Sequence, residues 1–182
     1  VIDLLENKQT KDITVGLHPS GMALSPDGSR LFVACANSDI ISVIDTNTDE
    51  VIEEISVRMQ KDLPFGSAPN ALTISNDGSQ LYVANGADNA VCVIKVGAPS
   101  TILGAIPTGW YPGSVILDEE ANFLFVANVK GVGSRNQKTN RGGYNSHDHQ
   151  GTVSIIPLPD EKKLAAMTQT VRDNNSFVQK LV

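Results

Sequence analysis

The side chains best suited to metal chemistry stand in one short run, His147-Asp148-His149. Neutral histidine is the commonest ligand for transition metals, and a carboxylate between two imidazoles suits part of a divalent metal site. Adjacent residues point in alternating directions, however, so three in a row rarely bind one ion. The alternative, which we favour, is a polar loop whose side chains hydrogen-bond to its own backbone.

A second group of residues suits binding rather than catalysis, because it combines aromatic and cationic side chains in long connections. Its members are His18, Phe65, Trp110, Tyr111, Arg135, Arg141 and Tyr144. Trp110 and Tyr111 have a second interpretation, in which they pack a corner between structural repeats and hydrogen-bond their polar tips. The sequence contains no nucleophile elbow, no phosphate-binding glycine loop and no catalytic-triad order. We therefore predict no catalytic residue and no cofactor, with a divalent metal left open.

The elements that must position these residues are internal repeats. The segment "SPDGSRLFVACANSDIISVID" from Ser25 returns as "SNDGSQLYVANGADNAVCVIK" from Ser75, at an offset of 50. A third copy places Leu124 at an offset of 43 from Leu81, and its closing segment "GTVSII" at an offset of 62 from "NAVCVI". The third copy is therefore interrupted by 19 extra residues. The opening "VIDLLENKQTKDITV" matches residues 43–57, so the chain starts within a repeat and is expected to be a fragment.

Each copy reads as four short strands joined by turns. In the first copy they are "GMALS", "RLFVA", "IISVIDT" and "VIEEISV", with an Asp-Gly turn after the first. The second and third are apolar on both faces, so each sheet must be covered on both sides. This pattern predicts an all-β fold, a partial β-propeller of about three and a half four-stranded antiparallel blades, with a short C-terminal helix. A β-sandwich would not repeat in this way, and a β-helix has far shorter rungs.

The expected boundaries follow from the repeats. The propeller segment covers 1–158, with a half blade at 1–15, blades at 16–57, 66–107 and 109–157, and an insertion at 129–150 inside the last blade. Residues 159–182 are expected to form a helix and linker that leave the propeller. Asp160 suits the helix N-cap, and Leu164, Met167 and Val171 follow it at helical spacing.

The strand "LYVAN", preceded by "PNALTISNDG" and followed by "NAVCVI", resembles the YVTN-repeat family of β-propellers, over roughly residues 1–157. That resemblance implies a seven-bladed ring, of which this chain holds about half. The combination of "GWYP", the insertion, "GTVSIIPLP" and the helix is similar to bacterial surface-layer-like proteins in which such a propeller is fused to a C-terminal phosphoesterase of the alkaline-phosphatase type. The narrower resemblance implies an exported protein, periplasmic or on the cell surface, whose phosphoesterase domain would follow Val182.

Composition narrows the choice of partners. The 182 residues carry a net charge of −6, and Lys and Arg never cluster beyond a pair. Nucleic acids and anionic membranes select dense basic surfaces, so neither is an expected partner. No apolar run approaches the length of a membrane span. Cys35 and Cys92 occupy non-equivalent repeat positions and are expected to be buried free thiols.

Together these features predict a non-catalytic propeller segment that binds or scaffolds. Connections of an antiparallel blade alternate between its two ends, which gathers the candidate residues at one end. The expected partners are the remaining blades, from the same chain or another copy, and the phosphoesterase domain that the resemblance implies. The alternative is a lactonase-type propeller enzyme with a divalent metal in the central channel. Such an enzyme needs polar or acidic ligands from several blades, and the equivalent positions here are Cys35, Asn85 and Asn128, without a carboxylate.

Overall fold

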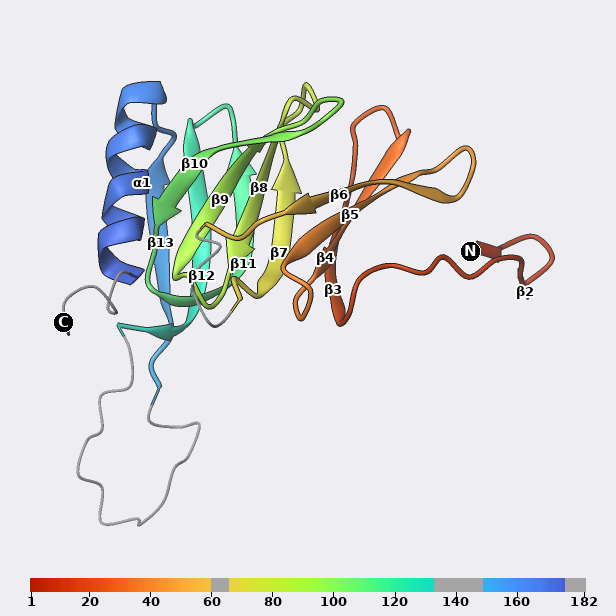
Figure 1. Cartoon of the computed structure of the whole chain (residues 1–182), viewed down its shortest axis with the longest axis horizontal. Coiled ribbons are helices and arrows are strands. Elements are labelled where there is room, and N and C mark those ends of the chain that lie inside the picture. Colours follow the sequence, from red (N-terminus) through yellow and green to blue (C-terminus); the bar gives the residue numbers. More distant parts are fainter. Residues whose placement is uncertain (60–65, 133–148, 176–182) are drawn as a thin grey trace, which may run out of the picture.

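The chain folds into a row of antiparallel sheets with one helix at the end (Figure 1). The computed structural model describes residues 1–59, 66–132 and 149–175. The first sheet contains β3 (Pro19–Leu24), β4 (Arg30–Cys35), β5 (Ile40–Asp45) and β6 (Glu50–Ser56). The second contains β7 (Pro69–Ile74), β8 (Gln80–Asn85), β9 (Ala90–Lys95) and β10 (Thr101–Pro107). The third contains β11 (Trp110–Asp118), β12 (Phe123–Gly131) and β13 (Thr152–Pro157).

This architecture confirms the predicted all-β fold and partial β-propeller. Strands pair with their sequence neighbours throughout, as a blade requires. Of the predicted insertion, residues 133–148 lie outside the described part of the chain, between β12 and β13. None of the helices described is long and apolar enough to cross a membrane.

The Asp-Gly turns form as the sequence indicated. Gly28 and Gly78 adopt φ values of 73° and 72°, which glycine reaches without steric cost. The Asp27 carboxylate accepts hydrogen bonds from the Ser25 hydroxyl at 2.6 Å and from the Ser29 backbone N–H at 3.0 Å. The repeat of this motif at Asp77 makes both turns equivalent.

The cores lie between successive sheets, which explains why the central strands are apolar on both faces. Phe32 and Val43 of the first sheet share one buried cluster with Leu81 and Ile94 of the second. The tail of β6 adds Ile55 to this cluster. A second cluster joins the second sheet to the third. Each aliphatic side chain that is fully buried in such a cluster stabilises the fold by about 1.5–3 kcal/mol. Cys92 belongs to the first cluster and Cys35 to the outer face of the first sheet, and both are buried free thiols, which confirms their predicted state.

A repeated hydrogen bond joins each sheet to the next at the backbone. The Asp39 carboxylate accepts from the Ala68 N–H at 3.0 Å, and the Asn89 side-chain carbonyl accepts from the Tyr111 N–H at 2.9 Å. Asp39 and Asn89 stand at equivalent positions of the first and second repeats, and Ala68 and Tyr111 each precede the first proline of the next sheet. We call this pair of contacts the inter-sheet clasp.

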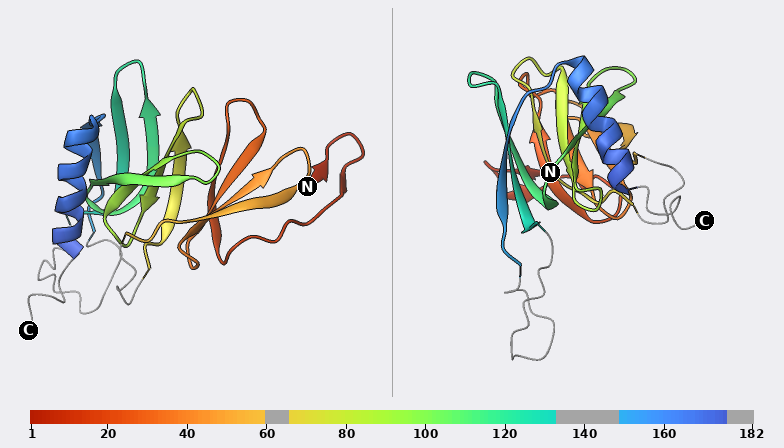
Figure 2. Two further views of the ribbon diagram at one scale, coloured as in Figure 1. Left: turned by 45° about the horizontal axis from the view of Figure 1, so that its top comes forward. Right: turned by 90° about the vertical axis from the view of Figure 1, so that its left-hand side faces the viewer.

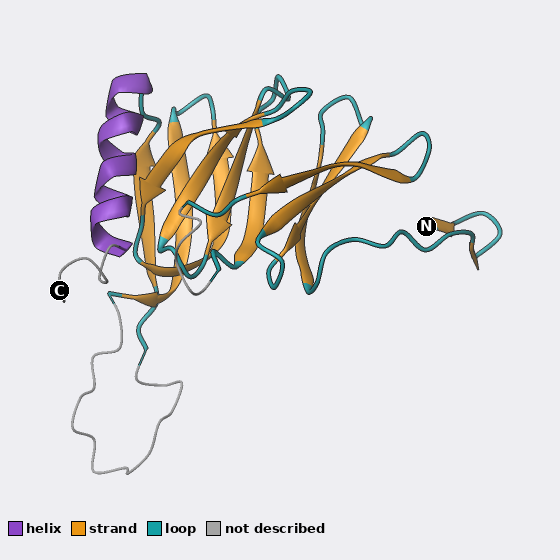
Figure 3. Ribbon diagram, in the orientation of Figure 1, coloured by secondary structure: helices purple, strands orange, loops and turns teal. Residues whose placement is uncertain are grey.

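Both ends of the row depart from the four-stranded pattern. At the N-terminus, β1 (Ile2–Asp3) and β2 (Lys8–Gln9) form a separate hairpin, set apart from the sheets in Figure 3. Ile13 and Val15 then pack on the outer face of the first sheet, against Val33 and Cys35. At the other end, the third sheet has three strands in the described chain.

Helix α1 (Glu161–Asn175) follows β13 and begins at the predicted cap, where the Lys163 N–H donates to the Asp160 carboxylate at 2.7 Å. It does not project from the sheets, because it packs against β10 of the second sheet (Figure 2). Leu164, Thr168 and Val171 are its buried residues. The Thr168 hydroxyl accepts from the Ala105 N–H at 2.9 Å, on β10, the edge strand of the second sheet.

We predict that Thr168→Val destabilises the protein by about 1–3 kcal/mol, because it strands the buried Ala105 N–H. Thr170 is the matched control, because its exposed hydroxyl donates to the Ala166 carbonyl as the Thr168 hydroxyl donates to the Leu164 carbonyl. Thr170→Val should change stability by no more than about 0.5 kcal/mol. Urea denaturation of both variants measures the difference, and equal effects would show that the helix contact with β10 contributes nothing.

Candidate functional site

The links between sheets and the connections between second and third strands lie along one side of the row of sheets, the lower side in Figure 1. We call this side the loop end. His18 is exposed there, at the start of β3, and its carbonyl accepts from the Ala36 N–H at 3.0 Å. Trp110 and Tyr111 open β11, two sheets further on. His18 and Tyr111 therefore both lie at the loop end, but on the first and the third sheet respectively. Six further candidates lie outside the described residues: Phe65, Arg135, Arg141, Tyr144, His147 and Asp148.

Tyr111 sits in the joint between the second and third sheets. Its N–H is held by the inter-sheet clasp, and a Cβ on Gly86 would lie only 3.1 Å from Tyr111 Cζ. The Lys130 ammonium lies 5.0 Å from the centroid of the tyrosine ring, a cation–π distance. Tyr111 therefore packs on the joint and carries a positive charge over its ring.

Trp110 is 49% exposed, although it precedes this packed tyrosine. It lies opposite Gly131 in the β11–β12 ladder, next to the start of the insertion. A large aromatic side chain that is half exposed beside a fixed cation–π pair is a surface that protein partners use often.

His149 is the one member of the His147-Asp148-His149 run in the described chain. Its Nδ1 atom is buried and has no hydrogen-bond partner among the described residues. Within the described ranges no three His, Cys, Asp or Glu side chains gather closely enough to hold a metal ion. The metal site stays a prediction, because two of its three residues are not described.

A buried polar cluster between the first and second sheets was not predicted from the sequence. The Asn85 amide donates to the Asp88 carboxylate and to the Val57 carbonyl, both at 3.0 Å, and the Ser67 hydroxyl also donates to Val57, at 3.2 Å. Asp39, the clasp residue, lies 3.6 Å from the Arg58 guanidinium. The offset of 50 between Asp39 and Asn89 was the available signal for the clasp, but Asp88 has no acidic counterpart in the other repeats.

Burial raises the pKa of the Asp88 carboxyl, and the nearby Asp39 carboxylate adds to that shift, while hydrogen bonds from Ser67 and Asn85 oppose it. The C-terminal end of α1 contacts this buried cluster as well, because the Asn175 amide donates to the Asp88 carbonyl at 2.9 Å. The cluster therefore ties together two sheets, their link and α1.

Two asparagines keep a free acceptor in the interior. The Asn128 amide donates to the Ser154 hydroxyl at 2.9 Å and the Thr152 hydroxyl at 3.2 Å. The Oδ1 atoms of Asn85 and Asn128 are buried and accept no hydrogen bond within the described part of the chain. At the third equivalent position, Cys35 Sγ lies 3.7 Å from the Ser42 hydroxyl.

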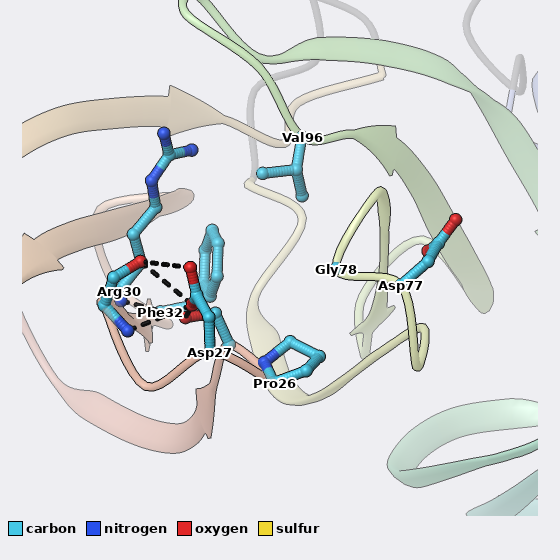
Figure 4. Close-up of a pocket in the computed structure, with 9 residues that line it drawn as sticks. Pro26, Asp27, Arg30, Phe32, Asp77, Gly78 and Val96 are labelled. Carbon is cyan, nitrogen blue, oxygen red and sulfur yellow. Dashed lines mark hydrogen bonds between the residues drawn. The ribbon is translucent and has the colours of Figure 1, made fainter.

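A cavity of about 220 Å³ opens on the side opposite the loop end, between the Asp-Gly turns of the first and second sheets (Figure 4). Phe32 and Val96 form its apolar walls, with Arg30 at the side. Its carboxylates, Asp27 and Asp77, are both engaged within their own turns. The cavity is smaller than the roughly 300–1,000 Å³ of typical ligand pockets.

No protein-family model and no curated protein matches the chain. Among solved structures it is similar to hydrazine synthase from Kuenenia stuttgartiensis, with 29% identity, a TM-score of 0.65, and coverage of 86% of this chain and 38% of that one. A putative 6-phosphogluconolactonase from Bacteroides uniformis matches at 19% identity and a TM-score of 0.53, covering 61% and 33%. A gluconolactonase from Xanthomonas campestris matches at 20% and 0.52, covering 82% and 40%. The chain spans less than half the length of each, and the likeness supports a propeller-like fold.

We predict that acid weakens the fold through the two turn carboxyls. The Ser25 and Ser75 hydroxyls, then the backbone N–H groups of Ser29 and Ser79, lower the pKa of Asp27 and Asp77 from 3.8 to about 2. Their stabilisation is therefore present above the unfolded pKa and lost as the pH falls from about 4 to about 2.

Urea midpoints measured across that range should fall for the wild type, and fall less for the double variant Asp27→Asn, Asp77→Asn. A double variant with the same acid dependence as the wild type would contradict this assignment.

Asp88 should behave in the opposite sense. Its raised pKa means that the folded protein holds the proton more tightly, so this group favours folding at low pH and opposes it as the pH rises through the folded pKa. Asp88→Asn is expected to keep or increase the free energy of unfolding at pH 7, whereas Asp88→Ala should lower it by about 1–3 kcal/mol, because the buried Asn85 amide loses one of its two acceptors. Thermal and urea denaturation distinguish them, and an equal loss in both variants would show that the charge itself is needed.

Proposed function

We propose that this chain is a non-catalytic propeller segment that binds or scaffolds a protein partner through its loop end. The observation that carries the proposal is the exposed Trp110 beside the fixed Tyr111–Lys130 pair. Trp and Tyr dominate the binding energy of protein interfaces when a rigid backbone presents them. Here the clasp from Asn89 and the contact with Gly86 supply that rigidity.

The acidic side chains near the joints and turns support the same conclusion. Asp27 and Asp77 are engaged in turns, Asp39 in the inter-sheet clasp, and Asp88 in the buried cluster. Each of these carboxylates therefore has a structural task that a catalytic role would interrupt. The exposed aromatic surface, by contrast, has no such task in the described chain.

The nature of the partner comes from the sequence resemblance. We propose that the segment belongs to a larger exported protein, periplasmic or at the cell surface, and that its loop end docks a phosphoesterase domain or positions that domain's substrate. The net charge of −6 and the lack of a basic cluster favour a protein surface over a nucleic acid.

One observation favours a second candidate, a lactonase-type enzyme with a divalent metal in the central channel. The unpartnered Oδ1 atoms of Asn85 and Asn128 occupy equivalent positions in adjacent repeats. Amide oxygens are ligands for hard divalent cations such as Ca²⁺. Two solved structures with lactonase names share the fold, at 19% and 20% identity.

Binding at the loop end is tested with Trp110→Ala, which should weaken capture of a protein partner from the natural source about 30-fold or more, the effect of losing an interface hot spot of about 2 kcal/mol. Leu103→Ala is the matched control, because Leu103 is 46% exposed but lies on the outer strand β10. Trp110 is the only tryptophan, so its fluorescence reports contact directly. Equal loss in both variants would contradict a loop-end site.

The enzyme alternative is tested separately on the purified chain. Stoichiometric divalent metal, together with hydrolysis of glucono-δ-lactone that is lost in Asn85→Ala and Asn128→Ala, would replace the binding proposal. Metal that is absent after dialysis against Ca²⁺ or Mg²⁺, with no hydrolysis, would eliminate the enzyme.

A further inference from the structure

The cavity between the Asp-Gly turns of the first and second sheets, which we call the slot, lies between two whole sheets. Each of these sheets has four strands in the described chain. The slot has a volume of about 220 Å³ and lies on the side opposite the loop end. The Phe32 ring lines its inner part, and Pro26, Gly78 and Val96 surround it (Figure 4). Its walls are therefore formed within the described chain.

The first repeat departs from the second at a residue that borders the slot. Between the second and third sheets, the Asn76 N–H donates to the Glu119 carboxylate and so links the two turns. Asn76 and Glu119 hold the same repeat position, which Pro26 occupies in the first sheet. Proline has no N–H, so the first turn cannot make this link to the second. The space between these two turns is therefore left open.

Two further residues of the slot change in the same direction. Phe32 corresponds to Tyr82, whose hydroxyl donates to the Gln80 side chain at 2.9 Å. Arg30 stands in the place of Gln80, and its side chain makes one contact in the described part of the chain, from Nη1 to the Gly97 carbonyl at 3.5 Å. A guanidinium has five N–H donors. The first repeat thus combines an apolar ring with a cation that keeps donors for an incoming acceptor.

The rim of the slot is acidic. Asp27 and Asp77 stand on the two turns that flank it. Hydrogen bonds from neighbouring serine hydroxyls and backbone N–H groups lower the pKa of both carboxyls to about 2, so both are ionised at neutral pH. The negative field extends to the next turn, because burial and then the Glu119 and Asp77 charges raise the pKa of the Tyr82 hydroxyl. A partner with positive charge matches this rim.

The dimensions of the slot suit one inserted side chain. Its volume is below the roughly 300–1,000 Å³ of small-molecule pockets. A second hollow of about 280 Å³ adjoins it at Arg30 and continues along Ile52 and Pro99. Glu53 borders that hollow. The two hollows form one groove between the first and second sheets, with apolar walls and acidic borders.

We propose that this groove docks an extended, basic segment of a partner protein. One apolar side chain of the segment enters the slot against Phe32, and lysine or arginine side chains on either side of it face Asp27 and Asp77. A backbone carbonyl of the segment accepts from the Arg30 guanidinium. Apolar burial supplies affinity, and the charges select the partner and its orientation. The groove lies on the side opposite Trp110, so this inference is independent of the function proposed for the loop end.

The test is an NMR titration of the whole ¹⁵N-labelled chain with blocked five-residue peptides. The first peptide has a central leucine between two pairs of lysines, the second has serine in place of leucine, and the third has glutamates in place of the lysines. The leucine–lysine peptide should shift the amide signals of Gly78 and Val96. It should bind about 10-fold or more tightly than the serine peptide, because only leucine buries an apolar side chain. The glutamate peptide should cause no shift.

Two sets of variants separate charge from space. Asp27→Asn with Asp77→Asn should weaken binding of the leucine–lysine peptide about 3- to 10-fold, because two exposed ion pairs are lost. Glu50→Gln with Glu120→Gln is the matched control, since both carboxylates are exposed near other turns on the same side and neither lines the groove. The control should change affinity less than about 2-fold. Val96→Phe fills the slot and should remove the preference for leucine over serine, and circular dichroism melts should confirm folding of each variant.

The comparison of peptides on the wild type decides the proposal even where a variant fails to fold. Equal affinity for the leucine and serine peptides would reduce the groove to a charged surface and overturn it. Binding of the glutamate peptide, or equal losses in the two double variants, would overturn it as well. Shifts confined to the surroundings of Trp110 would assign the peptide to the loop end, which separates a failure of this inference from a failure of the proposed function.

Discussion

The stacking of one sheet on the next is the contact on which the rest of this structure depends. Strands β4, β5, β8 and β9 are apolar on both faces, and a single sheet cannot bury both. Each sheet therefore buries an apolar face against the sheet next to it. The first and second sheets share one cluster, and the second and third share another. Stability then depends on neighbours in sequence, as in other repeat proteins.

Polar contacts then fix the angle at which the stacked sheets meet. Hydrophobic contact is not directional, so it does not by itself select one register between two sheets. The clasps from Asp39 and Asn89 supply direction, because each binds a single backbone N–H of the following link. The cluster around Asp88 adds α1 to the same joint through Asn175. Apolar area thus provides affinity between the sheets, and these few polar atoms provide geometry.

Local signals predicted most of the fold. The strands, the Asp-Gly turns and the cap at Asp160 depend on residues within a few positions of one another, and the repeat at an offset of 50 supports the strands. The docking of α1 on β10 was not predicted, because Thr168 and Ala105 are 63 positions apart and neither belongs to a repeated motif. The candidate site divides in the same way. Aromatic residues at the loop end were visible in the sequence, whereas the buried environment of Asp88 depends on three separate segments.

The backbone at the start of each sheet has a consequence for how such proteins diversify. His18, Ala68 and Tyr111 hold the same repeat position and adopt φ values of 58°, 49° and 58°, a conformation that costs an L-residue about 1–2 kcal/mol. This strain lies in the backbone, and the contacts between neighbouring sheets compensate for it. An imidazole, a methyl group and a phenol can therefore occupy the position alike. Three different side chains thus stand on one backbone conformation, so the chemistry at this position changes from sheet to sheet while the scaffold stays the same.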